Sequence, residues 1–421
     1  MASIPASELA HEILDACLRD GTWPTRTLDD LIERALDEDD MFLARSATRA
    51  LFGVVIEQLG DLFEPHLCDV YARLFAHVIS RALPEYKADE LLLRYRTIRQ
   101  VKRFGGGEVQ KVFVLSRVTL GADVAVTSVV LAASKERFPY AEICFVGPEK
   151  NAELFAADPR ITSIQLTYGR SSLLRERLEA AFELKGTVIE PSSIVIDPDS
   201  RLTQLGLIPV TDDEARYFFF ESRAFGGALD GSLPKLTAEW VREVFDVESA
   251  SPYVAPQRET RVADVAVSWG VGDNVSKRID GEFEYEVLAK LIQRGRSVII
   301  DCGAGGEEAE RVTRLSQRLS NPQLLHVHTG SYASFASHIA QSRLYVGYDS
   351  AGQHVAAAAG VPLVSVFKGY ACERMLSRWK PDTPAAQVVV VGCSDEPNAL
   401  ARTLRAIAAA EGEAARAAPT G

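Results

Sequence analysis

Apolar positions in the first hundred residues recur every three to four residues, the period of amphipathic helices. Glycine and proline interrupt this pattern where helices begin or end, at Gly21, Pro24, Gly60, Pro65 and Pro84. The pattern predicts helices over residues 7–19, 28–36, 42–59, 67–83 and 88–100. We therefore expect an all-α module over residues 1–104, which the three glycines at 105–107 separate from the rest of the chain.

After these glycines, short apolar runs alternate with amphipathic segments. The runs predict strands over residues 111–115, 142–146, 161–166, 193–196 and 217–220. The segments between and after them predict helices over residues 121–138, 149–156, 171–184 and 234–245. Continuously apolar strands separated by helices indicate a parallel sheet covered on both faces. We expect a first Rossmann-like lobe over residues 109–253.

The same rhythm restarts after a joint that contains Pro252 and Pro256. The predicted strands are residues 262–269, 297–301, 324–327, 344–347, 363–367 and 387–391. The predicted helices are residues 282–294, 307–319, 397–411 and an Ala-rich helix that ends at Gly360. The fold class is therefore α/β, with two Rossmann-like lobes preceded by the helical module. We expect the second lobe over residues 258–411, and a ligand cleft between the lobes because each places its loops at the carboxyl ends of its strands.

Composition narrows the possible functions. The net charge of −12 argues against broad nucleic-acid binding, which needs a basic face. The six cysteines are scattered without a CxxC pair, so we expect reduced thiols and no zinc site. His326 and His328 alternate on one strand without a third ligand, and we predict no metal. Residues 1–10 do not resemble a secretory signal, and no apolar run reaches the ~18 residues of a membrane span. We expect a cytoplasmic protein.

A basic cluster closes the helical module, formed by Arg94, Arg96, Arg99, Lys102 and Arg103. Such a cluster either complements the dipole of its own helix end or binds an acidic partner or an anionic membrane surface. Peripheral contact with the inner membrane, oligomerisation through the module and recognition of an acceptor all remain open.

The stretch over residues 344–360 is the most informative in the chain. A buried strand leads into a turn of small residues and then into an Ala-rich helix. Such a turn leaves backbone N–H groups unpaired at the positive end of the helix dipole, which suits a phosphate or a diphosphate. Ser350, Ala351 and Gly352 form the turn, and Asp349 and His354 flank it.

A second loop in the same lobe, residues 268–278, begins at Ser268, contains two glycines and ends with Lys277 and Arg278. Glycine lets the backbone approach a diphosphate, and the two cations would neutralise it. The alternative is an exposed loop with incidental charges. A third loop, residues 301–308, carries Glu307, whose carboxylate either binds ribose hydroxyls or merely begins a helix.

The first lobe offers a candidate general base. Asp123 lies in the first turn of the helix that follows the first strand, where a carboxylate can accept a proton from an attacking sugar hydroxyl. The alternative is that Asp123 complements the helix dipole. The loop is not a GxGxxG fingerprint, so it does not support dinucleotide binding.

Together these motifs resemble the ADP-heptose:lipopolysaccharide heptosyltransferases of glycosyltransferase family 9, which have the GT-B fold. The resemblance is carried by residues 120–124 (LGADV) with 134–139 (SKERFP), by residues 195–202 (VIDPDSRL), by the Lys-Arg step at 277–278, and by residues 349–357 (DSAGQHVAA) with 360–363 (GVPL). It spans roughly residues 109–405. Ala122 stands between Gly121 and Asp123, and Ala351 stands where the family has glycine.

The resemblance implies an inverting, metal-independent transfer of heptose or a related sugar from a nucleoside-diphosphate donor, without a cofactor. Asp123 would be the base. Donor-binding residues would be Ser268, Lys277, Arg278, Glu307, Asp349, Ser350, Ala351, Gly352 and His354. Acceptor-binding residues would be Arg117, Gly121, Asp199 and Arg201. The acceptor would be a cell-envelope glycan, lipid-linked or protein-linked, as in lipopolysaccharide biosynthesis. A non-catalytic nucleotide-sugar-binding scaffold and a sugar-nucleotide epimerase are the alternatives.

Overall fold

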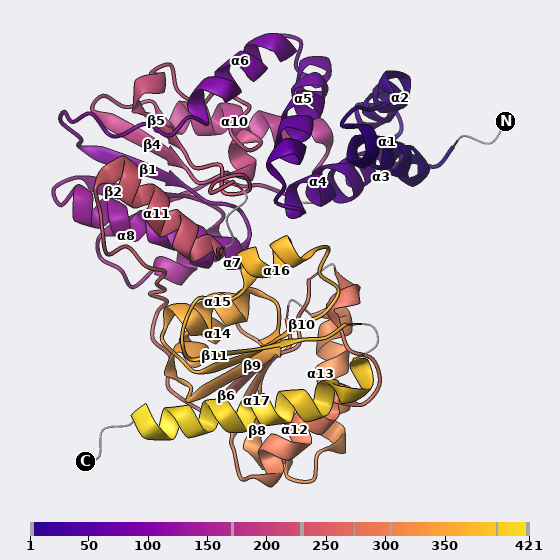
Figure 1. Cartoon of the computed structure of the whole chain (residues 1–421), viewed down its shortest axis with the longest axis vertical. Coiled ribbons are helices and arrows are strands. Elements are labelled where there is room, and N and C mark those ends of the chain that lie inside the picture. Colours follow the sequence, from indigo (N-terminus) through magenta and orange to yellow (C-terminus); the bar gives the residue numbers. More distant parts are fainter. Residues whose placement is uncertain are drawn as a thin grey trace. The chain divides into compact units, whose positions relative to one another are not determined.

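The computed structural model describes residues 4–169, 172–227, 231–272, 274–303, 305–392 and 395–417, so the predicted start of a helix at Ser171 lies outside the described residues. The chain divides into two compact units (Figure 1). The N-terminal unit comprises residues 1–118, 133–149 and 162–250, and the C-terminal unit comprises residues 119–132, 150–161 and 251–421. Residues 119–132 and 150–161 therefore belong with the second sheet, although they follow strands of the first. The domain boundaries expected from the sequence stay predictions.

The first hundred residues are helical, as predicted. The helices are α1 (Ala6–Asp20), α2 (Thr25–Ala35), α3 (Met41–Ala50), α4 (Glu57–Asp61), α5 (Pro65–Ala82) and α6 (Ala88–Ile98). Gly21 ends α1 in a left-handed conformation, and the Asp40 side chain accepts hydrogen bonds from the first N–H groups of α3. The single helix predicted over residues 42–59 is divided by a π-helical segment, Leu51–Ile56.

These helices share one hydrophobic core with the first sheet. Phe75 and Leu74 of α5 and Tyr95 of α6 belong to the same buried cluster as Phe113 and Phe219 of the sheet. The helices therefore bury their apolar faces mainly against one another and against the strands that follow.

The first sheet has five parallel strands in the order β3-β2-β1-β4-β5. The strands are β1 (Lys111–Leu115), β2 (Glu142–Gly147), β3 (Ile161–Gln165), β4 (Ser193–Asp197) and β5 (Tyr217–Phe219). The helices that follow strands of this sheet are α7 (Leu120–Ala122), α8 (Ser128–Arg137), α9 (Glu149–Ala152), α10 (Leu174–Val188) and α11 (Leu233–Phe245), with a π-helical segment Asp123–Thr127 between α7 and α8.

The second sheet has six parallel strands in the order β11-β10-β9-β6-β7-β8. The strands are β6 (Val265–Ser268), β7 (Val298–Asp301), β8 (Leu325–His328), β9 (Leu344–Tyr348), β10 (Leu363–Phe367) and β11 (Ala386–Val390). The helices are α12 (Phe283–Gln293), α13 (Gly306–Arg318), α14 (Tyr332–Gln341), α15 (Ala351–Ala358), α16 (Glu373–Trp379) and α17 (Glu396–Ala417). The α/β class with two parallel sheets is thus confirmed, while α14 and α16 lie where the pattern predicts no helix.

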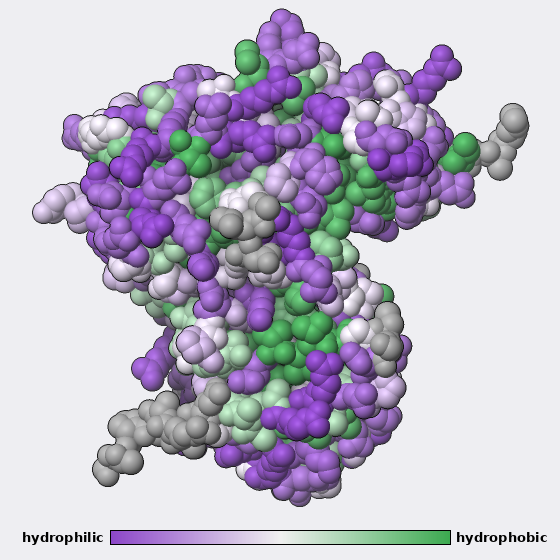
Figure 2. Space-filling model, in the orientation of Figure 1, coloured by the Kyte–Doolittle hydropathy of each residue, from purple (hydrophilic) through white to green (hydrophobic). Residues whose placement is uncertain are grey.

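Hydrophilic side chains cover most of the face shown in Figure 2, with hydrophobic ones in smaller groups. Among the helices that the structure describes, none is long and apolar enough to cross a membrane.

Candidate functional site

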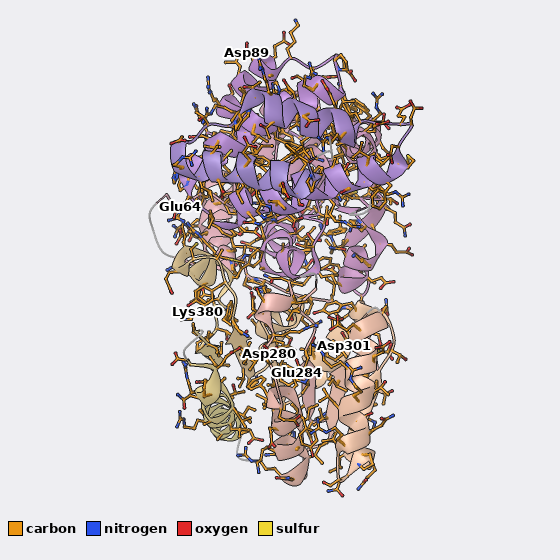
Figure 3. The ribbon with its side chains drawn as sticks, turned by 90° about the vertical axis from the view of Figure 1, so that its right-hand side faces the viewer. Glu64, Asp89, Asp280, Glu284, Asp301 and Lys380 are labelled. Atoms are coloured by element: carbon orange, nitrogen blue, oxygen red, sulfur yellow. The ribbon has the colours of Figure 1, made fainter. Side chains whose placement is uncertain are left out.

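The three loops expected to bind a donor come from adjacent strands of the second sheet. Ser268 ends β6, and its register partners are Asp301 at the end of β7 and Gly347 in β9. Because all these strands run parallel, their carboxyl ends lie at one edge of the sheet. The loops after Ser268, Asp301 and Tyr348 therefore gather at this edge. Asp301, at the end of β7, is labelled in Figure 3.

The turn between β9 and α15 is built around the buried Tyr345 side chain. A Cβ atom on Gly352 would lie 2.2 Å from the Tyr345 hydroxyl oxygen, and one on Gly347 would lie 2.4 Å from it. Burial raises the pKa of Tyr345, although the neighbouring Ser350 and Ser268 side chains oppose the shift, so the phenol stays neutral. The small residues of the motif are thus explained by the close approach of the turn to a tyrosine from its own strand.

Lys277 and Asp349, both predicted to bind the donor, form an ion pair in the C-terminal unit. The Lys277 Nζ atom lies 2.7 Å from Asp349 Oδ2 and 3.2 Å from the Asp349 carbonyl oxygen. The two side chains are 16% and 8% exposed. The pair places an ammonium group beside the phosphate-type turn, with its position fixed by two oxygen atoms.

Arg278 makes a different contact from the one expected. Its Nη1 atom lies 2.6 Å from Glu307 Oε1, so the predicted ribose carboxylate pairs with the predicted diphosphate cation. Lys368, which the sequence did not single out, donates to the Arg278 carbonyl oxygen at 2.6 Å. A bound diphosphate would have to compete with Glu307, whose side chain is 67% exposed, for this guanidinium.

In the third loop, residues 301–308, the Glu308 carboxylate packs against two glycines. A Cβ atom on Gly303 would lie 1.9 Å from a Glu308 carboxylate oxygen, and one on Gly270 would lie 3.3 Å from the other. Gly303 also has a positive φ of 65°, which favours glycine. The glycines at 270 and 303 therefore make room for a carboxylate of the protein.

His354 is buried in the first helical turns of α15. Burial and the nearby Lys277 lower the pKa of His354 to about 4, although Asp349 opposes the shift, so the ring is neutral at pH 7. A Cβ atom on Gly121 would lie 3.2 Å from His354 Cδ2 and 3.3 Å from Ala351 Cα. Within the C-terminal unit, Gly121 is thus packed on the start of α15 and allows close contact there.

Asp123, the predicted base, is fully buried in the π-helical segment. Its Oδ1 atom accepts a hydrogen bond from Thr127 Oγ1 at 2.6 Å, and its Oδ2 atom accepts one from Asn151 Nδ2 at 2.5 Å. Thr127 and Asn151 were not singled out in the sequence. The carboxylate is well oriented, and its role as a base stays a prediction.

The predicted acceptor residues of the N-terminal unit come together in part. Asp199, in a left-handed conformation, accepts from Arg223 Nη1 at 2.6 Å and Ser222 Oγ at 2.8 Å, and lies 3.8 Å from Arg117 Nη2. Arg201 begins the short 3-10 turn that follows. The carboxylate of Asp199 is therefore compensated by arginines within the protein, and its role toward an acceptor stays a prediction.

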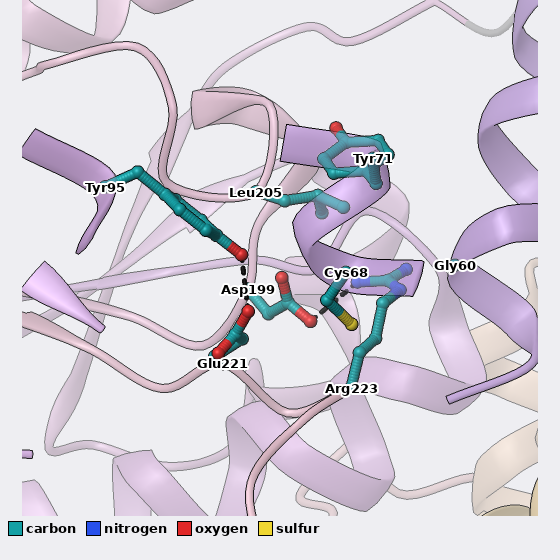
Figure 4. Close-up of a pocket in the computed structure, with 8 residues that line it drawn as sticks. All are labelled: Gly60, Cys68, Tyr71, Tyr95, Asp199, Leu205, Glu221 and Arg223. Carbon is teal, nitrogen blue, oxygen red and sulfur yellow. Dashed lines mark hydrogen bonds and ion pairs between the residues drawn. The ribbon is translucent and has the colours of Figure 1, made fainter. Parts of the chain in front are cut away.

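Asp199 also lines a small pocket between the first helices and the sheet of the same unit (Figure 4). Its other lining residues are Gly60, Cys68, Tyr71, Tyr95, Leu205, Glu221 and Arg223. The Glu221 carboxylate accepts from the Tyr95 hydroxyl and pairs with Arg99 at 2.8 Å. The pocket holds little more than a water molecule, so its polar groups serve mainly to join the helices to the sheet.

His328 has partners within the C-terminal unit. Its Nδ1 atom lies 3.2 Å from Asp301 Oδ1, and its Nε2 atom lies 3.2 Å from Ser334 Oγ. Among the described residues there is no group of three or more side chains suited to a metal. Of the cysteines, Cys393 lies outside the described residues, and Cys17, Cys68, Cys144, Cys302 and Cys372 are not joined in disulfides.

Gln353, in the first turn of α15, is a further residue of the site that the sequence analysis did not single out. Gln353 is fully buried, and its amide nitrogen donates to Asp349 Oδ1 at 2.5 Å. A polar pair, Gln353 and His354, in an otherwise Ala-rich helix is the sequence signal that could have identified it, because a buried polar group must find partners.

Comparison with solved structures identifies the fold. The fold matches GT-B glycosyltransferases. The E. coli ADP-heptose LPS heptosyltransferase II is 16% identical, with 72% of this chain and 99% of that chain covered and a TM-score of 0.52. A glycosyl transferase family 9 structure from Veillonella parvula is 16% identical, with 74% and 99% covered and a TM-score of 0.54. E. coli heptosyltransferase WaaC with ADP-2-deoxy-2-fluoro heptose is 14% identical, with 71% and 99% covered and a TM-score of 0.51.

A family model matches part of the C-terminal unit. Residues 273–400 match the model of glycosyltransferase family 9 (heptosyltransferase), and this stretch contains the Lys277–Asp349 pair and the whole turn into α15. The resemblance drawn from the motifs is confirmed for this stretch. No curated protein matches the chain in sequence.

Proposed function

We propose that this protein is a glycosyltransferase that moves a sugar from a nucleoside-diphosphate donor to a glycan or to a lipid- or protein-linked acceptor. Heptose or a related sugar is the proposed sugar, because the family model carries the heptosyltransferase description and the similar WaaC structure contains an ADP-heptose analogue. The proposed transfer is inverting, and it uses neither a metal nor a cofactor.

The observation that carries this proposal is the pairing of Lys277 with Asp349 beside the turn into α15. The turn supplies backbone N–H groups at a helix N-terminus, and the ammonium supplies a positive charge that two oxygens of Asp349 hold in place. Both the N–H groups and the ammonium would stabilise the negative charge of a diphosphate, and this charge is greatest as the nucleoside diphosphate leaves.

The proposed reaction has one chemical step. An acceptor hydroxyl attacks the anomeric carbon of the donor sugar, the bond from that carbon to the diphosphate oxygen breaks, and the nucleoside diphosphate leaves. The hydroxyl proton passes to the proposed base, the carboxylate of Asp123. Thr127 and Asn151, which hydrogen-bond that carboxylate, would fix its orientation.

A second candidate function is a non-catalytic nucleotide-sugar-binding protein of the same fold. The observation that favours it is the environment of Asp123, which is fully buried with both carboxylate oxygens already hydrogen-bonded. Because the carboxylate has no exposed surface, its surroundings would have to move before it could meet an acceptor hydroxyl.

Labelled ADP-heptose, ADP-glucose, UDP-glucose and UDP-N-acetylglucosamine distinguish these functions. A transferase releases the nucleoside diphosphate, slowly to water and faster when a cell-envelope extract supplies the acceptor. A binding protein retains the donor intact, and an epimerase returns an isomeric nucleotide sugar without any acceptor. Donor that is bound and recovered unchanged with every extract would contradict the proposed transfer.

A further inference from the structure

Gln353 lies at the centre of the hydrogen bonds that set the geometry of the proposed donor site. Its side chain has no exposed surface, and the partners described below come from the turn after β9, from β10 and from α16. The amide nitrogen donates to Asp349 Oδ1 at 2.5 Å and to the Trp379 carbonyl oxygen at 3.3 Å. The amide oxygen accepts from the Ser365 hydroxyl of β10.

Each carboxylate oxygen of Asp349 has its own partner, Gln353 for one and Lys277 for the other. Oδ1 accepts from the Gln353 amide, and Oδ2 accepts from the Lys277 ammonium at 2.7 Å. A carboxylate bound at only one oxygen can rotate about its last bond, whereas one bound at both has a fixed plane. The Gln353 amide therefore sets the direction from which Asp349 meets Lys277.

The Asp349 carboxylate orients the amide itself. Asparagine and glutamine side chains can reverse their nitrogen and oxygen, but a carboxylate only accepts, so the amide nitrogen must face Asp349. The buried Ser365 hydroxyl, which can donate or accept, completes this arrangement by donating to the amide oxygen. The chain of contacts runs from Ser365 through Gln353 and Asp349 to Lys277.

We infer that Gln353 is a positioning residue for the proposed donor site, which holds Asp349 so that Lys277 is placed to meet the diphosphate of a nucleotide. This inference rests on the proposed function and extends it to a residue that does not itself touch the nucleotide. The titratable or charged groups around Gln353 are Asp349, Lys277 and His354, with Arg378 next to Trp379 in α16.

The substitution Gln353→Glu tests this role, because the protonation of the new carboxyl group decides the outcome. A protonated carboxyl group can still donate to Asp349 and accept from Ser365, whereas an ionised one places a second negative charge against Asp349. The measurement is calorimetric titration of the full chain with ADP and with UDP between pH 5.5 and pH 8. Gln341→Glu is the matched control, since the Gln341 amide donates to Glu259 O and to Ser337 in the same unit, away from Asp349.

For Gln353→Glu we expect nucleotide affinity about tenfold or more below that of the unmodified protein at pH 8, with the ratio returning toward one at pH 5.5. Gln353→Leu, which can donate at no pH, should stay weak throughout, and Gln341→Glu should follow the unmodified protein. Equal affinities for Gln353→Glu and the unmodified protein across this range overturn the inference, as does a loss that does not change with pH in a protein with an unchanged melting temperature. Absence of ADP and UDP binding to the unmodified protein overturns the proposed function and this inference with it.

Discussion

The ammonium of Lys277 lies 2.7 Å from a carboxylate oxygen of Asp349, although the two residues are 72 positions apart in the chain. The contact joins the loop after β6 to the turn after β9, which are adjacent strands of the second sheet. Each charge is mostly removed from water, and so each depends on the other.

Breaking this pair should destabilise the C-terminal unit. Lys277→Met leaves the buried carboxylate of Asp349 without its cation, and we expect a loss of about 1–3 kcal/mol in the free energy of unfolding. Asp349→Asn should cost a similar amount. The double variant should lose at least about 1 kcal/mol less than the sum of the single losses, because the second substitution removes the charge left unpaired by the first. Urea denaturation of the four proteins measures this, and strictly additive losses would show that the contact contributes nothing.

Replacing Gly352, the second residue of α15, should destabilise the protein. Gly352→Ala places a Cβ atom 2.2 Å from the hydroxyl oxygen of Tyr345, a side chain that is fully buried. We expect a loss of about 1–3 kcal/mol, as for other overpacked cores. Gly53→Ala is the matched control, since a Cβ atom there meets nothing within 4 Å in a helical segment. A shift in denaturation midpoint that is equal for the two variants would contradict this account of the turn.

The stability of the N-terminal unit should fall as the pH rises from the unfolded-state pKa of Asp197 to its raised pKa in the folded protein. Burial raises the pKa of Asp197 from 3.8 to about 6, although Thr203, Tyr217 and the Ser200 N–H group oppose the shift. Between these values the folded state binds more protons than the unfolded state, so the free energy of unfolding decreases with increasing pH. Asp197→Asn removes this titration. The stability of the unmodified protein minus that of Asp197→Asn should therefore decrease by up to about 3 kcal/mol from pH 4 to pH 7. A difference that increases with pH would mean that Asp197 is stabilised as a carboxylate.

Asp123→Ala should abolish transfer while leaving donor binding nearly intact. A general base contributes about 10²–10⁴-fold to a rate, and the residue lies outside the cation-bearing loops. Thr127→Val is the companion variant, because it removes one hydrogen bond to the carboxylate and leaves the carboxylate itself. Its transfer rate should fall less than that of Asp123→Ala. Full activity in Asp123→Ala, measured as nucleoside diphosphate released with acceptor present, would sink the assignment of the base.

The repeating patterns in the sequence were sufficient for the strands and most helices. Apolar runs such as residues 363–367 became buried strands at the predicted positions, because a parallel sheet covered on both faces leaves little ambiguity. The motifs after β6 and β9 likewise identified Lys277 and Asp349, which the structure brings together. Helices α14 and α16 were missed. The seven residues of α16 are too few to show a helical period, whereas Phe335, Ala336 and Ile339 of α14 do have helical spacing and could have identified that helix.

The partners of the charged residues could not be predicted. Nothing in the spacing showed that Glu307 would pair with Arg278, or that Glu308 would lie over Gly270, because both contacts join separate loops. The burial of Asp123 depends on Asn151, which follows a different strand. Residue patterns along the chain define elements, whereas these pairs depend on how loops from different strands meet.

The central claim is that the loops of the C-terminal unit bind a nucleoside diphosphate around Lys277. Calorimetric titration of the unmodified protein and of Lys277→Met with ADP and UDP tests it directly, with Lys290→Met as a control on an exposed lysine of α12. We predict that the unmodified protein and Lys290→Met bind at least one of the two nucleotides equally well, and that Lys277→Met binds it about 10–100-fold more weakly. Unchanged affinity in a folded Lys277→Met protein, or no binding by the unmodified protein, would contradict the claim.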